Sequence, residues 1–346
     1  MFDTDSLLKL AKLTYTSQSV FRILFFLGKF KVHKDLKTTK KEIEKLNIDL
    51  KDWIDKDTDL KIECEREGNH DFRSVDTASV LAGIIKKKTG HENFTFKHPD
   101  LIIYIYINNN QGYIGIDFAG KNLSKRQYKI FQSRNSIKAT LAYSLIRISG
   151  FSKNKLLADV FSREGIIPIE AALFTQDYPV NFFTKHELIF TKLKPLKNVD
   201  FEDFFKNIDK NIKKTKREIY AVDALLKYVK FSKKNAKIAG VLDAISFSKK
   251  EMEWLDLKFD KTEVDCIVSY PVQMTKRRNK KEIKKLYNEF FYQCEYILKD
   301  KGKIVLLSKD SKYLEEEGKK YKFKVEKKRE VYSGMMKYLV LTFVKE

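Results

Sequence analysis

The chain has 346 residues, which is too many for one ordinary hydrophobic core and predicts two domains. Its 43% of hydrophobic residues exclude an intrinsically disordered chain. Lys and Arg number 69 against 47 Asp and Glu, and the formal net charge of +22 indicates an anionic partner, unless the lysines merely solvate the surface. Nucleic acid is the first candidate for that partner and an anionic membrane surface is the second.

Further features narrow the class of protein. No stretch approaches the ~18–20 consecutive apolar residues of a membrane span, so we expect no membrane-embedded segment. The N-terminus carries Asp3 and Asp5 and no basic region, which argues against a signal peptide. The cysteines fit neither a zinc pattern nor a disulfide framework, so we predict no metal site and a reducing, cytoplasmic location.

The first 120 residues predict a helix followed by a small α+β unit. Residues 5–30 space their apolar side chains with a helical period. The stretch 59–67, "DLKIECERE", alternates apolar and charged residues as a half-buried strand does, and 74–88 predict an amphipathic helix ending in lysines. Residues 99–120 place an Asn/Gly turn between two runs rich in Ile and Tyr, which predicts a hairpin.

In the second half, strands alternate with helices. A helix at 136–149 precedes a strand, a loop and a helix at 155–174, and 218–240 repeat that order. The later elements are strands at 243–255, 264–270, 302–310 and 337–346 and a helix at 280–298. This alternation predicts a mostly parallel, doubly wound sheet. The Lys-rich segment 205–217 interrupts the spacing between the first two strands and indicates an insertion.

Several motifs, which follow one another in the same order as in a known protein family, indicate a resemblance to that family. "CEREGNHDFRSVD" (64–76), the helix after it and "YIGIDFAGKNLSKRQY" (113–128) resemble a THUMP RNA-binding domain and its exit. "LADVFSREGIIPIEAAL" (157–173) resembles the cofactor motif Asp-Pro-x-Cys-Gly-Ser-Gly-Thr-Ile-Pro-Ile-Glu-Ala-Ala. Over residues 13–346 the chain is similar to THUMP-containing RNA methyltransferases, in particular the archaeal and bacterial tRNA guanine-N2 methyltransferases.

The resemblance implies a domain plan and partners. It implies an α+β THUMP-like N-terminal domain over 1–120, a connector at 121–136, and an α/β doubly wound, Rossmann-like class I methyltransferase domain over 137–346. It also implies S-adenosylmethionine as the cofactor and RNA, with tRNA first, as the partner. We expect no membrane partner and predict no oligomeric state.

The cofactor site implied by the resemblance lies at the ends of the first strands of this second domain. Its residues are Asp159, Phe161, Ser162, Gly165, Asp223 and Glu251. Asp223 would accept both ribose hydroxyls and Glu251 the adenine amine, although Asp159 and Asp223 could also simply cap helices. Arg163 replaces a family glycine, and because a Cβ resists positive φ, we expect a rebuilt loop or a partly filled pocket, with weak or absent cofactor binding.

The catalytic turn implied by the resemblance is Ser269-Tyr270-Pro271-Val272, where the family has Asn/Asp-Pro-Pro-Tyr/Phe. In the family, the amide side chain and a backbone carbonyl of the turn accept the two N–H bonds of the target amine, while the aromatic ring stacks on the base. Here Ser269 replaces the amide and Val272 replaces the ring. Tyr270 is expected to point away, because strand alternation places it on the opposite side. Losing these two contacts is worth on the order of 10²–10⁴ in rate.

Two basic clusters predict contacts to RNA phosphates, which need positive charge rather than particular side chains. They are "KRQYK" at 125–129, with Lys125 and Arg126, and "TKRRNKKEIKK" at 275–285, with Lys276, Arg277 and Arg278.

Three hypotheses for the function remain: an S-adenosylmethionine-dependent RNA guanine-N2 methyltransferase, a catalytically silent RNA-binding paralogue, or a subunit that needs another protein to complete its active site.

Overall fold

The structure is a computed structural model that describes residues 3–214, 218–274 and 279–346. The chain divides into two compact units. Unit 1 contains the residues up to Leu123 together with Asn181–Lys210, and unit 2 contains Ser124–Val180 and the chain from Asn211 onwards. No helix in the described part of the chain is both long and apolar enough to cross a bilayer.

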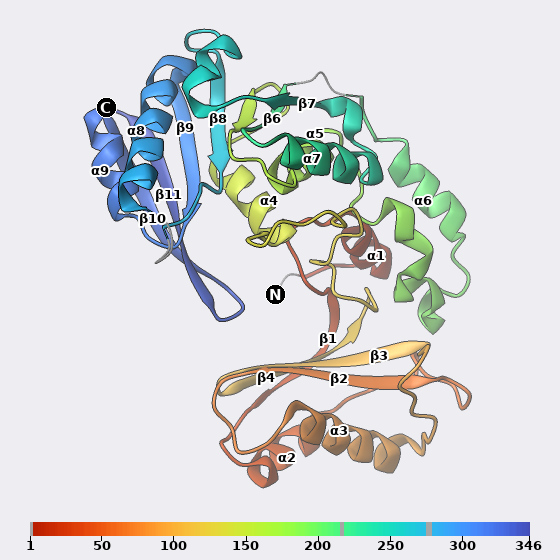
Figure 1. Cartoon of the computed structure of the whole chain (residues 1–346). Coiled ribbons are helices and arrows are strands. Elements are labelled where there is room, and N and C mark those ends of the chain that lie inside the picture. Colours follow the sequence, from red (N-terminus) through yellow and green to blue (C-terminus); the bar gives the residue numbers. More distant parts are fainter. Residues whose placement is uncertain (1–2, 215–217, 275–278) are drawn as a thin grey trace. The chain divides into compact units, whose positions relative to one another are not determined.

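Unit 1 is built on a four-stranded sheet with the order β1-β4-β3-β2. Its elements are α1 (Leu7–Thr16), β1 (Leu24–Lys31), α2 (Leu36–Glu44), β2 (Leu60–Glu67), α3 (Ser74–Thr89), β3 (Leu101–Asn108) and β4 (Gln111–Asp117). β2 and β3 are parallel, whereas β4 pairs antiparallel with both β3 and β1. Helices α2 and α3 cover one face of the sheet (Figure 1). The strand, helix and hairpin expected over 59–118 are therefore present.

The helix expected over residues 5–30 is shorter than predicted. It ends at Thr16, and Leu24–Lys31 form strand β1 instead. β1 pairs with β4 from Leu24 opposite Asp117 to Lys31 opposite Gln111, with a bulge between Phe26 and Gly28. The helix prediction was wrong here because the apolar spacing fits both a helical period and a strand period. The segment forms a strand because it pairs with β4, which comes from a distant part of the chain.

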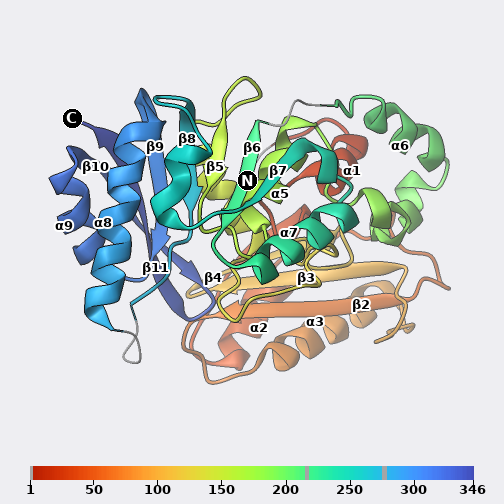
Figure 2. The same ribbon diagram turned by 45° about the horizontal axis from the view of Figure 1, so that its top comes forward.

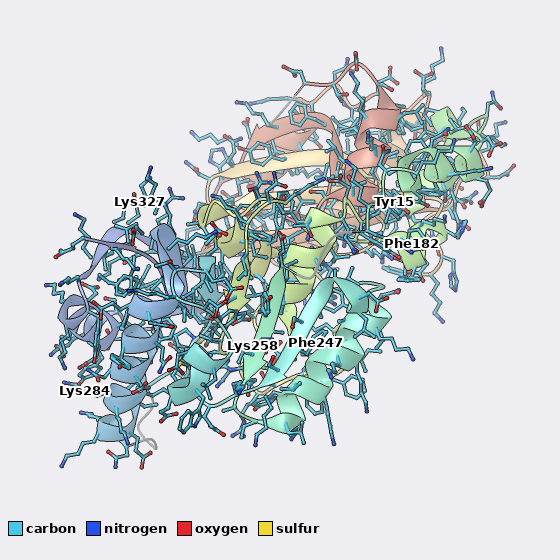
Figure 3. The ribbon with its side chains drawn as sticks, turned by 90° about the horizontal axis from the view of Figure 1, so that it is seen from above. Tyr15, Phe182, Phe247, Lys258, Lys284 and Lys327 are labelled. Carbon is cyan, nitrogen blue, oxygen red and sulfur yellow. The ribbon has the colours of Figure 1, made fainter. Side chains whose placement is uncertain are left out.

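The segment Asn181–Lys210 joins unit 1, although the residues on either side of it belong to unit 2. It contains short 3₁₀ turns at Phe182–Glu187, Ile189–Lys192 and Lys194–Leu196, followed by helix α6 (Phe201–Asp209). Phe205 packs edge-on against Tyr15 of α1, and the Tyr15 hydroxyl donates to Asp209 at 2.6 Å; Figure 3 labels Tyr15 and Phe182. The inserted segment expected at 205–217 thus begins earlier, because its aromatic residues complete the core of unit 1.

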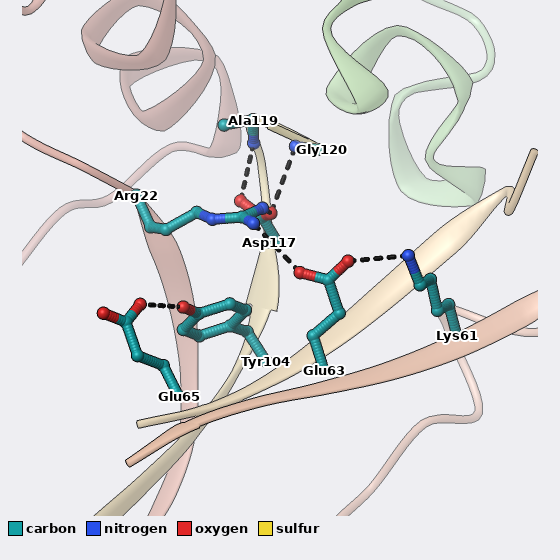
Figure 4. Close-up of polar contacts among 8 residues, drawn as sticks. All are labelled: Arg22, Lys61, Glu63, Glu65, Tyr104, Asp117, Ala119 and Gly120. Atoms are coloured by element: carbon teal, nitrogen blue, oxygen red, sulfur yellow. Dashed lines mark hydrogen bonds and ion pairs between the residues drawn. The ribbon is translucent and has the colours of Figure 1, made fainter. Parts of the chain in front are cut away.

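A polar network spans the sheet of unit 1 (Figure 4). Arg22 pairs with Asp117 and, at 2.9 Å, with Glu63, and its guanidinium lies over the ring of Tyr104. Tyr104 in turn donates its hydroxyl to Glu65. Two backbone N–H groups of the loop after β4 donate to Asp117 as well. Burial raises the pKa of Asp117, and Arg22 opposes that rise, so the network fixes the segment before β1 to the end of β4.

Unit 2 contains a seven-stranded sheet with the order β10-β11-β9-β8-β5-β6-β7. Its strands are β5 (Leu157–Asp159), β6 (Ile219–Asp223), β7 (Ile245–Lys249), β8 (Val264–Ser269), β9 (Leu298–Ser308), β10 (Phe323–Ser333) and β11 (Met336–Lys345). All run parallel except β11, which is antiparallel to both neighbours. The strand order reverses at β5, which lies between β6 and β8. Ligands of doubly wound sheets bind at the carboxyl ends of the strands beside such a switch point.

Helices cover both faces of this sheet (Figure 2). They are α4 (Ala139–Ile148), α5 (Ile166–Thr175), α7 (Leu226–Ile238), α8 (Lys280–Ile297) and α9 (Lys312–Lys320), with short turns at Leu242–Ala244 and Met252–Leu257. Residues of α4, α5 and α7 share one core cluster, and residues of α8 and α9 share another. The doubly wound architecture expected from the sequence is thereby confirmed.

Candidate active site

A pocket of about 480 Å³ opens at the carboxyl ends of β5, β6 and β8. Its wall comes from the β5–α5 loop, the β6–α7 turn, the residues after β7, the turn after β8, and α8. Residues from these segments that line it are Phe161, Arg163, Asp223, Glu251, Val272 and Leu286. The pocket therefore lies at the switch point of the sheet, and it brings the sequence-predicted cofactor loop and catalytic turn together.

Asp159 ends β5 and is buried, and it lines a second, smaller cavity rather than this pocket. Its Oδ1 accepts the Ser269 hydroxyl at 2.7 Å and the backbone N–H of Phe161 at 3.3 Å. Burial raises the pKa of Asp159 from 3.8 to about 7, and these two hydrogen bonds only partly oppose that rise. Asp159 thus links the ends of β5 and β8 and carries a carboxyl group that titrates near neutrality.

The β5–α5 loop depends on one glycine. Gly165 has φ +81° and precedes the first residue of α5. A Cβ at this position would lie 2.0 Å from the Ser232 hydroxyl oxygen, so no larger residue fits without moving α7. Arg163 also keeps a left-handed backbone, with φ +48°, although it is not glycine. The loop therefore retains a glycine-type backbone path at a cost of about 1 kcal/mol or more.

Asp223 ends β6 and anchors the same loop. Its two carboxylate oxygens accept the backbone N–H groups of Arg163 and Leu225, each at 2.9 Å. Burial raises the pKa of Asp223, and these backbone hydrogen bonds oppose the rise. A carboxylate offers about four acceptor sites, so Asp223 retains capacity for ligand hydroxyls in the pocket.

The side chain of Arg163 lies against the catalytic turn. Its Nη2 donates to the Pro271 carbonyl at 3.2 Å, and its Nη1 donates to the Asn135 carbonyl at 3.3 Å. The guanidinium carbon lies 4.6 Å from the centre of the Tyr270 ring. The arginine therefore occupies space between the cofactor loop and the turn while the loop backbone keeps its course.

The turn after β8 has few free acceptors. The Ser269 hydroxyl is fully buried, where it donates to Asp159 and accepts the N–H of Val160 at 3.1 Å. The Pro271 carbonyl accepts Gln273 Nε2 at 2.8 Å in addition to Arg163. Ser269 thus acts here as a connector between strands, and its hydroxyl is not presented to the pocket as the predicted replacement for the family amide would be.

Tyr270 and Val272 line different cavities. Strand alternation does not explain this, because residues two apart share a face and β8 ends at Ser269, so the course of the turn separates them. Val272 lines the main pocket, and its carbonyl accepts the Tyr287 hydroxyl at 2.6 Å. Tyr270 is buried and contacts Tyr338 of β11 and a small cavity beside Asp159. Burial raises the pKa of Tyr270. The pocket wall therefore has an aliphatic side chain where a ring would stack on a base.

Other predicted cofactor residues lie around the pocket. Phe161 lines the pocket and packs against Phe290 of α8, and Glu251 is exposed at the start of the turn after β7. The buried Ser162 hydroxyl has no hydrogen-bond partner within the described residues. Sequence reasoning missed Asn135, which precedes α4 and carries no motif. It also missed Gln273, whose position directly after the turn could have indicated it.

The residues predicted to contact RNA differ in their exposure to solvent. Lys125 is exposed. Arg126 is not available to RNA, because its side chain is 2% exposed and pairs with the fully buried Glu170 of α5 at 2.9 Å. The prediction for Arg126 is therefore wrong: its charge serves the core of unit 2. Lys276, Arg277 and Arg278 lie outside the described residues.

The pocket fits S-adenosylmethionine. Its volume falls in the range typical of small-molecule sites. The pocket lining includes a carboxylate at Asp223 and another at Glu251, together with the apolar side chains of Phe161 and Leu286. This set combines hydroxyl and amine acceptors with a flat apolar surface, which is what an adenosine group requires.

Comparison with known proteins agrees with this geometry. Residues 126–338 match the family described as RMKL-like, methyltransferase domain, and residues 37–117 match the THUMP domain. A tRNA (guanine(6)-N2)-methyltransferase from Methanocaldococcus jannaschii is 28% identical, with 97% of this chain and 89% of the relative covered. A tRNA (guanine(6)-N2)-methyltransferase from Archaeoglobus fulgidus is 23% identical over 70% of this chain and 59% of the relative.

Solved structures share the fold over nearly the whole chain. SMU.472, crystallised with SAH, has a TM-score of 0.78 at 18% identity and covers 99% of this chain and 88% of its own. TrmN from Thermus thermophilus has a TM-score of 0.67 at 18% identity and covers 100% of this chain and 87% of its own. Both domain types expected from the motifs are therefore present in the expected order.

Proposed function

Because the chain belongs to the RMKL-like methyltransferase domain family and carries a THUMP domain, we propose that it methylates the N2 amino group of a guanine in tRNA. The observation that carries this proposal is the pocket at the switch point, which joins the cofactor loop to the turn after β8. The tRNA guanine-N2 specificity rests on the archaeal relatives that carry that name.

The residues that line the pocket would have different roles in binding the cofactor and the target base. S-adenosylmethionine is the cofactor and supplies an electrophilic methyl group when bound. Asp223 would accept ribose hydroxyls with the lone pairs that its backbone partners leave free, and Glu251 would accept the adenine amine. Phe161 and Val272 would pack against the ring systems and exclude water from the reaction.

The target amine needs an acceptor for its N–H bonds so that its lone pair leaves conjugation with the guanine ring. We assign this acceptor to the Pro271 carbonyl, which becomes available when Arg163 withdraws. Arg163 now donates to two neutral carbonyls, whereas a guanidinium binds a phosphate more strongly and with two hydrogen bonds. An RNA phosphate near the pocket mouth would therefore draw Arg163 away from the turn.

A second candidate, the catalytically silent RNA-binding paralogue, is favoured by one observation. The Ser269 hydroxyl is buried between Asp159 and Val160, so it provides no acceptor to a substrate. Val272 also replaces the aromatic ring of the family in the same turn. Both replacements favour slow methyl transfer or none.

Transfer of labelled methyl from S-adenosylmethionine to bulk tRNA separates the two candidates. We expect slow transfer by the unaltered chain and a rise of about 5- to 150-fold in Val272→Tyr, because a base–aromatic stack is worth ~1–3 kcal/mol. Val272→Leu, which changes shape without adding a ring, is the matched control and should change little. Absence of transfer by all three proteins, with tRNA binding retained, would leave the silent paralogue.

A further inference from the structure

A basic groove lies on unit 2 outside the pocket. It has a volume of about 320 Å³ and runs between the end of α4 and the edge strands of the sheet. Its charged lining consists of Arg147, Lys303, Lys327 and Arg329, with Glu326 as the one carboxylate. With four cations and one anion in its lining, the groove carries a local excess of positive charge.

Most of these cations are not neutralised by the protein. Lys303 pairs with Glu326 at 2.9 Å. Arg147 lies over the ring of Phe174 and donates to a tyrosine hydroxyl, so it is positioned by neutral groups. In the described part of the chain, no carboxylate lies within ion-pair distance of Arg147, Lys327 or Arg329. Figure 3 shows Lys327 extended from the β10–β11 ribbon. Uncompensated cations that share a concave surface attract a polyanion.

The groove shares a face of the sheet with the active-site turn. Arg329 is opposite Val340, and two residues further along β10, Val331 is opposite Tyr338. Since side chains alternate along a strand, all four lie on the same face, and two residues span about 6.6–6.8 Å. Tyr338 contacts the ring of Tyr270, with centroids 6.1 Å apart. Val340 and Tyr270 are buried, so this row packs in the core, and the groove ends two residues along β10 from the side chains that contact the turn where we place the target base.

We propose that this groove binds the sugar-phosphate backbone of the substrate RNA next to the target nucleotide. The proposal rests on RNA being the substrate and adds the residues of unit 2 that hold it. Lys327 and Arg329 contact phosphates directly, and Arg147 closes the groove from α4. Such contacts position the RNA without reading its sequence.

The test measures binding of fluorescently labelled bulk tRNA at several salt concentrations. Each phosphate contact contributes about 0.7–0.9 to the slope of log affinity against log salt, so Lys327→Gln with Arg329→Gln should lower that slope by about 1.4–1.8. Raising the salt from 50 to 200 mM should then weaken binding about 7- to 12-fold less in the variant than in the unaltered chain.

The matched control carries the same change of charge elsewhere on unit 2. Lys261→Gln with Lys319→Gln neutralises two exposed lysines, one in the turn before β8 and one on α9. This pair should leave the slope unchanged. Equal slopes for the groove pair and the unaltered chain would overturn the proposal. So would a groove pair that loses binding to phosphatidylserine vesicles while it keeps its tRNA slope, because the groove would then face lipid.

Methyl transfer is measured on the same proteins so that the two proposals fail separately. A flattened slope in a chain that transfers no methyl group supports the groove and removes the proposed activity. An unchanged slope together with active transfer removes the groove and leaves the activity.

Discussion

Arg163 is the residue whose replacement tests the cofactor pocket most directly. Its side chain lines the pocket and is held by two carbonyl hydrogen bonds and by the ring of Tyr270. Both hydrogen bonds exceed 3 Å, so we count each near the low end of the usual range, ~0.5 kcal/mol, and the ring contact at ~0.5–1 kcal/mol. Cofactor binding that displaces the guanidinium thus loses about 1.5–2 kcal/mol. Arg163→Ala should therefore bind S-adenosylmethionine about 10- to 30-fold more tightly.

Arg163→Gly separates this effect from backbone strain. Both variants lack the guanidinium, so both should gain the same affinity. Only glycine relieves the cost of φ +48°, so it should be more stable than the alanine variant by about 1 kcal/mol, or about 2–4 °C in Tm for a domain of this size.

Two measurements on the three proteins decide the matter. Calorimetry gives the affinity for S-adenosylmethionine, and thermal unfolding without cofactor gives the strain. Unchanged affinity in both variants would show that the guanidinium does not compete with the cofactor. Weaker binding in both variants would show that Arg163 contacts the cofactor itself, and competition between the two would be refuted.

Three further predictions concern buried groups of unit 2. The pKa of Asp159 is raised to about 7, so folding favours its protonated form, and its contribution to stability is full below about pH 4 and is lost as the pH rises through 7. Asp159→Asn should remove this loss, of which at most about 3 kcal/mol falls between pH 4.5 and pH 8, the two values at which denaturant unfolding will measure it. Arg126→Met should destabilise the chain by about 3–5 kcal/mol in the same assay, because it removes the cation that pairs with the buried Glu170 carboxylate. Gly165→Ala should lower Tm strongly, because the added Cβ would clash with a neighbouring side chain and the backbone there has a positive φ. Gly83→Ala should raise Tm slightly, because Gly83 lies within helix α3 and an added Cβ would meet no atom within 4 Å.

Much of the fold could be predicted because periodicity and motif order carry it. The strand-to-helix alternation after residue 136 and the hairpin before residue 120 are local patterns, and local patterns survive in the structure. Strand β10 was missed because Phe323–Ser333 carry charges at most positions and a bulge near Val325 shifts the alternation. The membership of Asn181–Lys210 in unit 1 was missed because it depends on packing partners more than a hundred residues away.

The site was predicted in outline for the same reason, and its details depend on contacts that no local pattern shows. The acidic residues at the ends of β5 and β6 could be placed because strand ends are readable from the sequence. The burial of Arg126 could not, because its partner Glu170 belongs to a motif that looked like part of the cofactor site. A basic residue in a charged stretch looks exposed until the carboxylate that it neutralises is known.

The two departures from the family motifs are physically coupled, which changes their meaning. Arg163 replaces a glycine of the cofactor loop, and Tyr270 stands in the turn where the family has a proline; in the structure the guanidinium of one lies over the ring of the other and also binds the carbonyl of Pro271. Random decay of an unused site would not be expected to leave two new side chains, 107 positions apart, in a packed and hydrogen-bonded arrangement. The pair instead forms a packed contact whose separation costs about 1.5–2 kcal/mol, for two hydrogen bonds and one ring contact. An energy of that size is small enough for one phosphate contact to overcome. If the chain methylates RNA as we propose, the residues that look like erosion in the sequence would restrict methyl transfer to the RNA-bound protein.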